Sequence, residues 1–338
     1  MGRQSQWIAA PATIQAMEDK MKTLKRMMVA LLALLPLATG MAVADTEYGY
    51  DRIFIFGASF MDSGNHFVLT GETAHPPFVP LGPSYPMGGF NFSNGPTWVD
   101  VIAAEMKLPE GAMPAYRNPV FGNYAVGYAR ARDVAPDPLE PSLYDQVAAW
   151  DGNGYCTGNP TDRLHDTLFV MDSAYFDALD LLQAPDDQSD EILGGWLASI
   201  SNNIYALYLC GAHNMLVPYL PDMGSAPGIP PESKAAATEA SFGFNYFFLQ
   251  SIVDFYNGPP FNMNITTVDF FALTTMVLAT PEEYGFTNMT DSCVAFGVTN
   301  GAFCKDRDSY FFWDPLHPSK SAHALMAEFA LPQLPVAE

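Results

Sequence analysis

The sequence predicts an α/β fold, a three-layer α/β/α sandwich built on a central parallel sheet. Short apolar runs alternate with segments of helical period through most of the chain, and this alternation is typical of a parallel sheet covered on both faces. Residues 45–338 contain no internal repeat, low-complexity tract or linker, so they are expected to form a single domain. The chain has 338 residues, of which 49% are hydrophobic. This length and composition are enough to bury one large hydrophobic core.

Residues 1–44 have the pattern of a cleaved secretory signal peptide. A basic stretch ends at Arg26, an apolar run follows over 27–37, and residues 42–44 offer small side chains for signal peptidase. The apolar run is about half of the roughly 20 residues that span a bilayer, so a permanent membrane anchor is the weaker alternative. We therefore expect a secreted or periplasmic protein.

The elements of the domain follow in order along the chain. Each predicted strand is a short run rich in apolar residues, and each predicted helix repeats its apolar side chains with a helical period. Strands are expected at 52–56, 121–127, 167–171, 213–219 and 265–270, and helices at 97–107, 143–150, 191–210, 234–256 and 319–330.

Residues 67–96 have no sustained period and are expected to form a long loop. Loops of this length in compact domains are usually functional. The loop contains Phe67, Phe78, Tyr85, Phe90 and Phe92. These rings suit an acyl chain or an aryl group, and the alternative is that they only pack the loop against the core.

Charge and cysteine content restrict the function classes. With 15 basic against 37 acidic residues, the formal net charge is −22, which would repel a phosphate backbone and argues against a nucleic-acid partner. The 293/304 cysteine pair closes a short loop and favours a disulfide, whereas Cys156 and Cys210 are compatible with a second bridge or with two buried thiols. No CxxC or His-rich tract supports a metal site.

A candidate nucleophile follows the first predicted strand directly, in Gly57-Ala58-Ser59-Phe60. The carboxyl ends of parallel strands are where α/β folds place ligands, and a turn or helix start there offers backbone N–H groups to an anion. Ser59 is well placed for such a role, although a Gly-x-Ser after a strand is more often only a turn.

A candidate base lies near the C-terminus, in Asp314-Pro315-Leu316-His317-Pro318. An aspartate three residues before a histidine can fix the imidazole tautomer and leave the other ring nitrogen to take a proton from a serine. The alternative is that Asp314 is only part of a helix cap and that His317 is structural.

The two motifs together resemble the first and last sequence blocks of the GDSL/SGNH hydrolase family. Segments between them resemble further family blocks in the family's order: 92–100 (FSNGPTWVD), 123–129 (NYAVGYA) and 211–224. The resemblance covers roughly 50–332. The α/β-hydrolase pattern Gly-x-Ser-x-Gly fits less well, because Met61 occupies its second glycine position.

The resemblance implies an SGNH-hydrolase, flavodoxin-like fold and a Ser-His-Asp triad. Ser59 would be the nucleophile, His317 the general base and Asp314 its orienting partner, with the oxyanion held by the N–H groups of Ser59 and Gly127. Such a serine needs a base to accept its proton, and the developing oxyanion needs donors aimed at it. The reaction needs no metal and no organic cofactor.

The chain departs from the family pattern at two places. The family usually carries Gly-Asp-Ser, so the aspartate that braces the nucleophile turn is replaced by Ala58. The family's Gly-x-Asn-Asp block, whose asparagine is the third oxyanion donor, corresponds to a stretch around Met171-Asp172-Ser173-Ala174-Tyr175. One alignment puts Ser173 at the asparagine position as a shorter donor, and the other puts Ala174 there and leaves the donor missing.

These features predict a secreted serine esterase or lipase that hydrolyses carboxylic esters, with lipid or other acyl esters first among its substrates. A small-molecule or lipid ester is the expected partner, and a lipid substrate allows transient contact with a membrane surface. The alternatives are a catalytically weak or inactive binding protein on the same fold and a carbohydrate deacetylase.

Overall fold

A computed structural model describes residues 48–71, 90–134, 139–156, 158–159, 164–294 and 303–337. The predicted signal peptide at 1–44 lies outside the described residues, as do Phe78 and Tyr85 of the aromatic loop. None of the described helices is both long and apolar enough to cross a bilayer.

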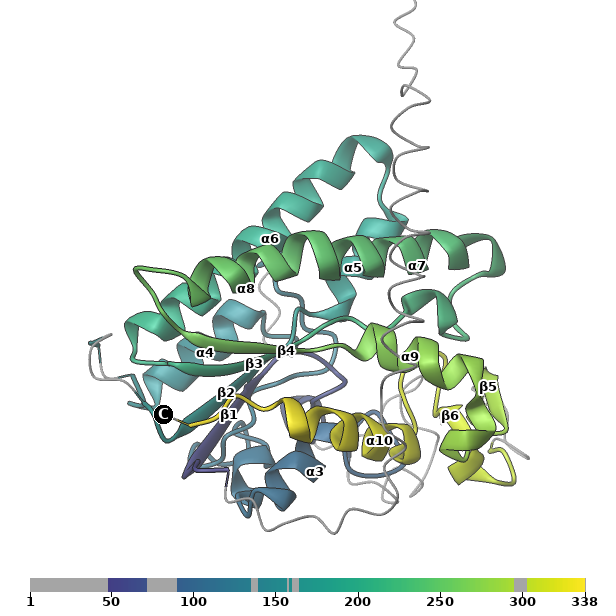
Figure 1. The fold of residues 1–338 in the computed structure, drawn as a ribbon, viewed down its shortest axis with the longest axis horizontal. Helices are drawn as coiled ribbons and strands as arrows, with labels where there is room; N and C mark the ends of the chain where they lie inside the picture. Colours follow the sequence, from purple (N-terminus) through teal and green to yellow (C-terminus); the bar gives the residue numbers. More distant parts are fainter. Residues whose placement is uncertain are drawn as a thin grey trace, which may run out of the picture. The chain divides into compact units, whose positions relative to one another are not determined.

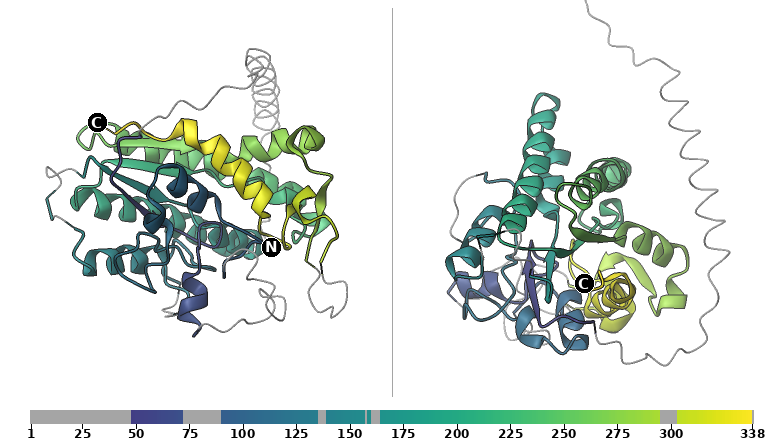
Figure 2. Two further views of the ribbon diagram at one scale, coloured as in Figure 1. Left: turned by 90° about the horizontal axis from the view of Figure 1, so that it is seen from below. Right: turned by 60° about the vertical axis from the view of Figure 1, so that its left-hand side comes forward.

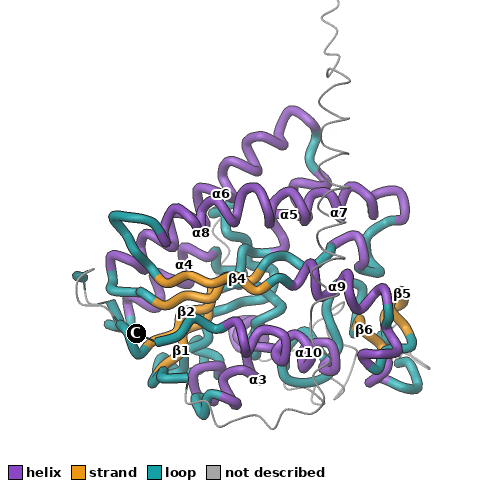
Figure 3. Tube along the Cα trace, in the orientation of Figure 1, coloured by secondary structure: helices purple, strands orange, loops and turns teal. Residues whose placement is uncertain are grey.

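A parallel sheet forms the centre of the domain (Figures 1 and 3). Its four strands run in the spatial order in which they occur in the sequence: β1 (Arg52–Phe56), β2 (Thr167–Met171), β3 (Asn214–Pro218) and β4 (Asn264–Val268). Phe56 pairs with Met171, so β1 and β2 end level with each other. The residues that follow these two strands therefore emerge side by side at the carboxyl edge of the sheet.

Helices cover both faces of this sheet, which confirms the predicted three-layer α/β/α architecture. Helices α3 and α10 pack together on one face, and α4, α5, α6 and α8 cover the other (Figures 1 and 2). The bounds are α2 (Asn65–Leu69), α3 (Trp98–Glu105), α4 (Leu143–Gly152), α5 (Tyr175–Gln183), α6 (Asp186–Leu209), α7 (Lys234–Gly243), α8 (Gln250–Asn257), α9 (Phe270–Ala279) and α10 (Lys320–Ala330).

The predicted strand at 121–127 is wrong as a full strand, although the segment lies where a fifth strand would. It makes one parallel bridge to β1, between Ile55 and Asn123. The Ile55 N–H donates to Gly122 O at 2.9 Å, and the Tyr124 N–H donates to Ile55 O at 2.7 Å. The segment is thus an extended chain held along the outer side of β1.

The predicted helix at 234–256 is continuous but has a π-helical turn, Phe244–Leu249, between α7 and α8. Helices α5 and α9 were not predicted. Neither was a small parallel sheet formed by β5 (Asn288–Ser292) and β6 (Tyr310–Phe312). Helix α9 lacks a polar face, since its ten residues carry no charge, and a helical period is correspondingly hard to see in it.

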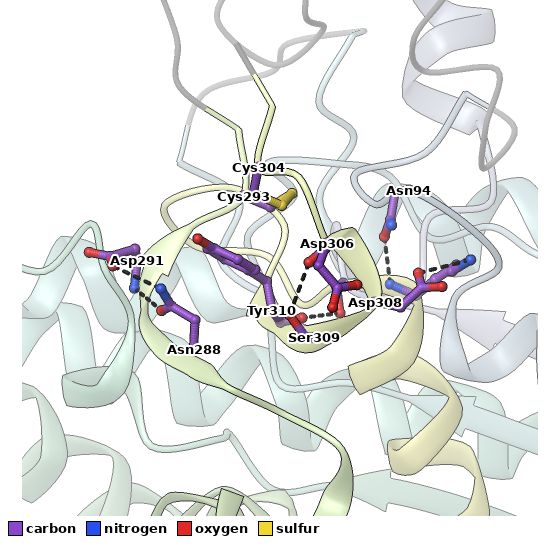
Figure 4. Close-up of a disulfide and its surroundings, with 11 residues drawn as sticks. Asn94, Asn288, Asp291, Cys293, Cys304, Asp306, Asp308, Ser309 and Tyr310 are labelled. Atoms are coloured by element: carbon purple, nitrogen blue, oxygen red, sulfur yellow. Dashed lines mark hydrogen bonds and ion pairs between the residues drawn. A yellow bond between two sulfur atoms is a disulfide. The ribbon is translucent and has the colours of Figure 1, made fainter. Parts of the chain in front are cut away.

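All four cysteines form disulfides in the structure. Cys293 pairs with Cys304 as expected. Cys156 pairs with Cys210, so these two cysteines form a second disulfide and are not two buried thiols. The Cys293–Cys304 bridge lies beside β6 (Figure 4). The Val294 N–H next to it donates to Trp313 O at 2.9 Å, so this bridge supports the segment that leads into Asp314.

Candidate active site

The turn after β1 presents Ser59 at the carboxyl edge of the sheet. Gly57 has a φ of +153°, which favours glycine. The side chain of Gln146 on α4 binds both backbone groups of Gly57: its Oε1 accepts from the Gly57 N–H at 2.8 Å, and its Nε2 donates to Gly57 O at 2.9 Å. Sequence reasoning missed Gln146, because nothing in a helical pattern marks a side chain that reaches a turn 89 residues away.

In the segment between β6 and α10, Asp314 fixes the position of His317. Asp314 Oδ1 accepts the backbone N–H groups of Leu316 at 2.8 Å and His317 at 2.7 Å. Asp314 Oδ2 lies 2.7 Å from His317 Nδ1. With both carboxylate oxygens engaged, the imidazole is held in one orientation, with Nδ1 toward the aspartate and Nε2 away from it.

The second imidazole nitrogen meets the serine. His317 Nε2 lies 2.8 Å from Ser59 Oγ, although the two residues are 258 positions apart. Ser59, Asp314 and His317 are 2%, 3% and 2% exposed. The structure thus brings together the three residues that the sequence singled out, in a continuous hydrogen-bonded chain that can move a proton from the hydroxyl to the imidazole.

Two aromatic rings enclose the imidazole. Phe60, next to the serine, lies edge-on to His317 with ring centroids 5.7 Å apart, and Phe92 lies 5.0 Å away. The chain after Phe92 is tied to the residues that follow His317: Ser93 Oγ donates to Pro318 O at 2.9 Å, and Asn94 Oδ1 accepts the Lys320 N–H at 2.7 Å (Figure 4). These bonds explain why an FSNG segment accompanies the site.

Gly127 does not lie as an oxyanion donor should, so this part of the prediction is corrected. Its N–H donates to Asp62 Oδ2 at 2.7 Å and is therefore directed at a buried carboxylate. A Cβ at this position would come within 2.2 Å of the Phe92 ring. The glycine is needed to make room for that ring, not to expose its N–H to a substrate oxygen.

Asp62 organises the chain around the site by accepting backbone N–H groups. Besides Gly127 it accepts N–H groups of Gly64 at 2.7 Å, Asn65 at 2.6 Å and His66 at 3.1 Å. Burial raises the pKa of Asp62 to about 6, and these N–H groups oppose the rise by stabilising the charged form. The carboxylate joins the nucleophile turn to the 123–127 segment.

Ser173 lies two residues beyond the end of β2, next to the nucleophile turn. It is 1% exposed, and its Oγ has no hydrogen-bond partner among the described residues. The Ser59 N–H likewise has no acceptor in the described part of the chain. Because a buried hydroxyl without a partner is costly, Ser173 Oγ is a candidate donor to a bound oxygen atom. The next residue, Ala174, has a φ of +62°, a backbone conformation that asparagine adopts more readily than alanine.

Two small, mainly apolar cavities adjoin the nucleophile turn. The first is lined by Ala58 and Ser173 and the second by Leu316 and Pro318. Both cavities share further lining residues, which are Phe60, Tyr175, Pro221, Phe270 and Met326. Both cavities therefore lie between Phe60, the neighbour of the serine, and Phe270 of α9, and neither is lined by Ser59 or His317.

One cluster in the described chain brings together side chains of metal-binding type, Asp151, Cys156 and Cys210. The two cysteines are joined in a disulfide, so their sulfur atoms are not available as thiolate ligands. This cluster is a bridge between α6 and the chain after α4, and it cannot hold a metal ion in this state.

Known proteins resemble this chain along most of its length. The family described as GDSL-like Lipase/Acylhydrolase matches residues 53–330. Two GDSL esterase/lipases of Arabidopsis thaliana are each 25% identical, one over 316 residues (81% of this chain and 85% of the relative) and one over 324 residues (84% and 88%). A solved variant of an acetyl-xylooligosaccharide esterase from Geobacillus overlaps 85% of this chain and 95% of its own at 13% identity, with a TM-score of only 0.39. From the family match, the chain belongs to the GDSL-like lipases and acylhydrolases and is a carboxylic ester hydrolase.

Proposed function

We propose that the chain is a secreted serine esterase or lipase in which Ser59 is the nucleophile, His317 the general base and Asp314 its orienting partner. The observation that carries this proposal is the continuous chain of contacts from Asp314 Oδ2 through both imidazole nitrogens to Ser59 Oγ, with distances of 2.7 and 2.8 Å. Both distances suit proton transfer through well-formed hydrogen bonds.

The reaction proceeds in two halves that use the same groups. Ser59 Oγ attacks the ester carbonyl carbon while His317 Nε2 takes the hydroxyl proton, and the carbonyl oxygen becomes an oxyanion held by the Ser59 N–H and Ser173 Oγ. The C–O bond to the leaving group breaks, His317 protonates the departing alcohol, and an acyl-serine remains. Water then attacks the acyl carbon, gives its proton to His317, and releases the carboxylic acid as Ser59 regains its proton.

The substrate we propose is an ester with an apolar acyl group, with lipid esters first. The rings of Phe60 and Phe92 lie beside His317, and two small, mainly apolar cavities lined by Tyr175, Phe270 and Met326 adjoin the turn at Phe60. Apolar lining favours an alkyl chain by removing its surface from water. It offers little to the hydroxyl groups of a sugar, which a carbohydrate deacetylase would bind through polar side chains.

Secretion is part of the same proposal. The leader at 1–44 has the pattern of a signal peptide, and the two disulfides, Cys156–Cys210 and Cys293–Cys304, suit an oxidising compartment. N-terminal sequencing of the protein recovered from the medium or periplasm tests this, with Asp45 expected as the first residue.

A fluorophosphonate probe tests the nucleophile. We expect the mature protein to be labelled once, at Ser59, and Ser59→Ala to lose both labelling and p-nitrophenyl ester hydrolysis, on the order of 10⁶-fold in kcat. Ser63→Ala is the matched control, because that hydroxyl lies four residues away and bonds Asp100 Oδ1 at 2.8 Å instead of His317. Labelling that persists in Ser59→Ala, or hydrolysis that survives it, would contradict the assignment.

A further inference from the structure

We propose that Asp172 is a positioning residue that holds together the two loops carrying the oxyanion donors, and that it replaces the bracing aspartate missing at Ala58. This inference rests on the proposed function, because it assigns a role within the same site. Asp172 follows β2 directly, and its own N–H donates to Phe56 O, the last carbonyl of β1, at 3.0 Å. Its side chain therefore starts beside the nucleophile turn.

Each carboxylate oxygen of Asp172 binds a different loop. Oδ2 accepts the Ala58 N–H at 3.2 Å, within the turn that presents Ser59. Oδ1 accepts the Ala174 N–H through a short hydrogen bond, within the loop that presents Ser173. One rigid, planar group thus sets the spacing between the Ser59 N–H and Ser173 Oγ, the two donors proposed to bind the oxyanion.

The nucleophile turn is shaped to admit this carboxylate. A Cβ at Gly57 would lie 2.7 Å from Asp172 Cγ and 2.9 Å from its Oδ2, distances that real Cβ atoms do not tolerate. Gly57 is thus required by the approach of Asp172 as well as by its own φ of +153°.

The contacts of Asp172 indicate a group that acts by hydrogen bonding and not by ion pairing. Among the described residues no ion pair joins it to a cationic side chain, and its partners are the backbone N–H groups of Ala58 and Ala174. Burial raises the pKa of Asp172 to about 6, and these two N–H groups oppose the rise. At pH 7.5 the carboxylate is therefore mostly ionised, with both oxygens available as acceptors.

The substitutions Asp172→Asn and Asp172→Ala test the proposal. Asparagine keeps the shape but has one acceptor oxygen, so one of the two loops loses its anchor, and alanine releases both. We expect kcat for p-nitrophenyl esters to fall about 10- to 100-fold in Asp172→Asn and further in Asp172→Ala, with KM changed less than about twofold, because misplaced donors weaken transition-state binding more than substrate binding. The rate of fluorophosphonate labelling is expected to fall in the same order.

Asp177→Asn is the matched control. Asp177 is a fully buried aspartate on α5 that also accepts a backbone N–H, that of Ala131 at 2.6 Å, and it pairs with Arg132 at 2.6 Å. Its loss is expected to lower Tm while kcat per phosphonate-titrated site stays at the wild-type value. Normalising to titrated sites removes any contribution of unfolded protein.

The outcomes separate this inference from the proposed function. Wild-type kcat per titrated site in Asp172→Asn, or an equal fall in Asp177→Asn, would overturn the positioning role of Asp172. If the wild-type protein is not labelled at Ser59 at all, the proposed function itself fails and not merely the role of Asp172.

Discussion

At the scale of single residues, the proposed oxyanion site depends on the hydroxyl group of Ser173. Because its Oγ is buried and has no partner among the described residues, we expect Ser173→Ala to lower kcat for ester cleavage by about 10²- to 10³-fold, the cost of one lost oxyanion donor. KM is expected to change little. Steady-state kinetics on the mature protein with a p-nitrophenyl ester measures both.

A second buried serine provides the comparison for Ser173. Ser241, on α7, is fully buried; its Oγ donates to Ala237 O at 2.8 Å and accepts the Met223 N–H at 3.2 Å. Ser241→Ala removes a bonded hydroxyl of similar burial, so it is expected to lower Tm and leave kcat unchanged. A Ser173→Ala enzyme with the wild-type rate would exclude the donor role and leave the oxyanion to the Ser59 N–H.

Single residues differ in how far the sequence predicts them. Ser59, Asp314 and His317 were predicted because each lies in a local motif whose residue types suit the chemistry. The donor role of Gly127 was wrong, because the direction of a backbone N–H depends on which acceptor lies near it, here Asp62. The proposed positioning role of Asp172 could not be predicted, because its side chain accepts the N–H group of Ala58, 114 positions away in the sequence. Such long-range contacts leave no local sequence pattern.

At the scale of elements, the packing of α3 against α10 depends on a neutral histidine. His323 on α10 is 1% exposed, and its Nδ1 accepts the Trp98 N–H at 3.3 Å. Burial, and to a smaller extent the nearby His317, lowers the pKa of His323 to about 3. The folded state therefore binds fewer protons than the unfolded state between pH 6.5 and 3, so the contribution of His323 to stability is present above pH 6.5 and is lost as the pH falls.

The His323→Gln variant isolates this contribution. At pH 5 the cost of keeping His323 neutral is about 2 kcal/mol, so the wild type is expected to lose about that much stability relative to His323→Gln between pH 7.5 and 5. Carboxylates that titrate in both proteins cancel in the difference. Urea unfolding at several pH values measures it, and a difference that stays constant with pH would show that His323 takes up a proton as readily in the folded state as in the unfolded state.

Elements were predicted best where the pattern is strong. The runs at 52–56 and 167–171 match β1 and β2, because buried parallel strands are continuous apolar runs between loops. The 121–127 segment has a similar run, but its pairing with β1 is limited to one bridge. Helix α9 was missed because all its faces are uncharged, so its packing against neighbouring elements such as α10, and not its own period, determines its conformation.

At the scale of the whole molecule, a net charge of −22 contrasts with an aromatic surface of few charges, where Tyr246 donates to the carboxylate of Asp269. Residues 240–253 and 270–279 contain no charged side chain. The rings of Phe242, Phe247 and Phe271 form a connected cluster there, with centroids 5.9 Å apart for Phe242–Phe247 and for Phe242–Phe271, and Phe247 is 61% exposed. We call this cluster the aromatic face. Phe270, the neighbour of Phe271 in α9, is buried and lines both cavities.

The net charge of the chain indicates which kind of partner surface the aromatic face would contact. Two copies of a chain with a charge of −22 repel each other, and an anionic membrane repels the chain in the same way at low salt. A neutral lipid surface removes the exposed rings from water without that repulsion. The lipid-surface contact that accompanies the proposed substrate class is therefore expected with zwitterionic lipid.

Vesicle flotation tests this contact through two phenylalanines of similar exposure. Phe247 and Phe255 are 61% and 59% exposed, but Phe255 packs with Phe261 in a separate cluster. We expect the mature protein to float with phosphatidylcholine vesicles and less with phosphatidylglycerol vesicles, and Phe247→Ser to weaken flotation about 5- to 30-fold while Phe255→Ser does not, since burying one phenylalanine contributes about 1–2 kcal/mol. Equal effects of the two substitutions would show that exposed rings in general cause the binding. Concentration-dependent dimerisation abolished by Phe247→Ser would assign the face to a second copy of the chain instead of a lipid surface.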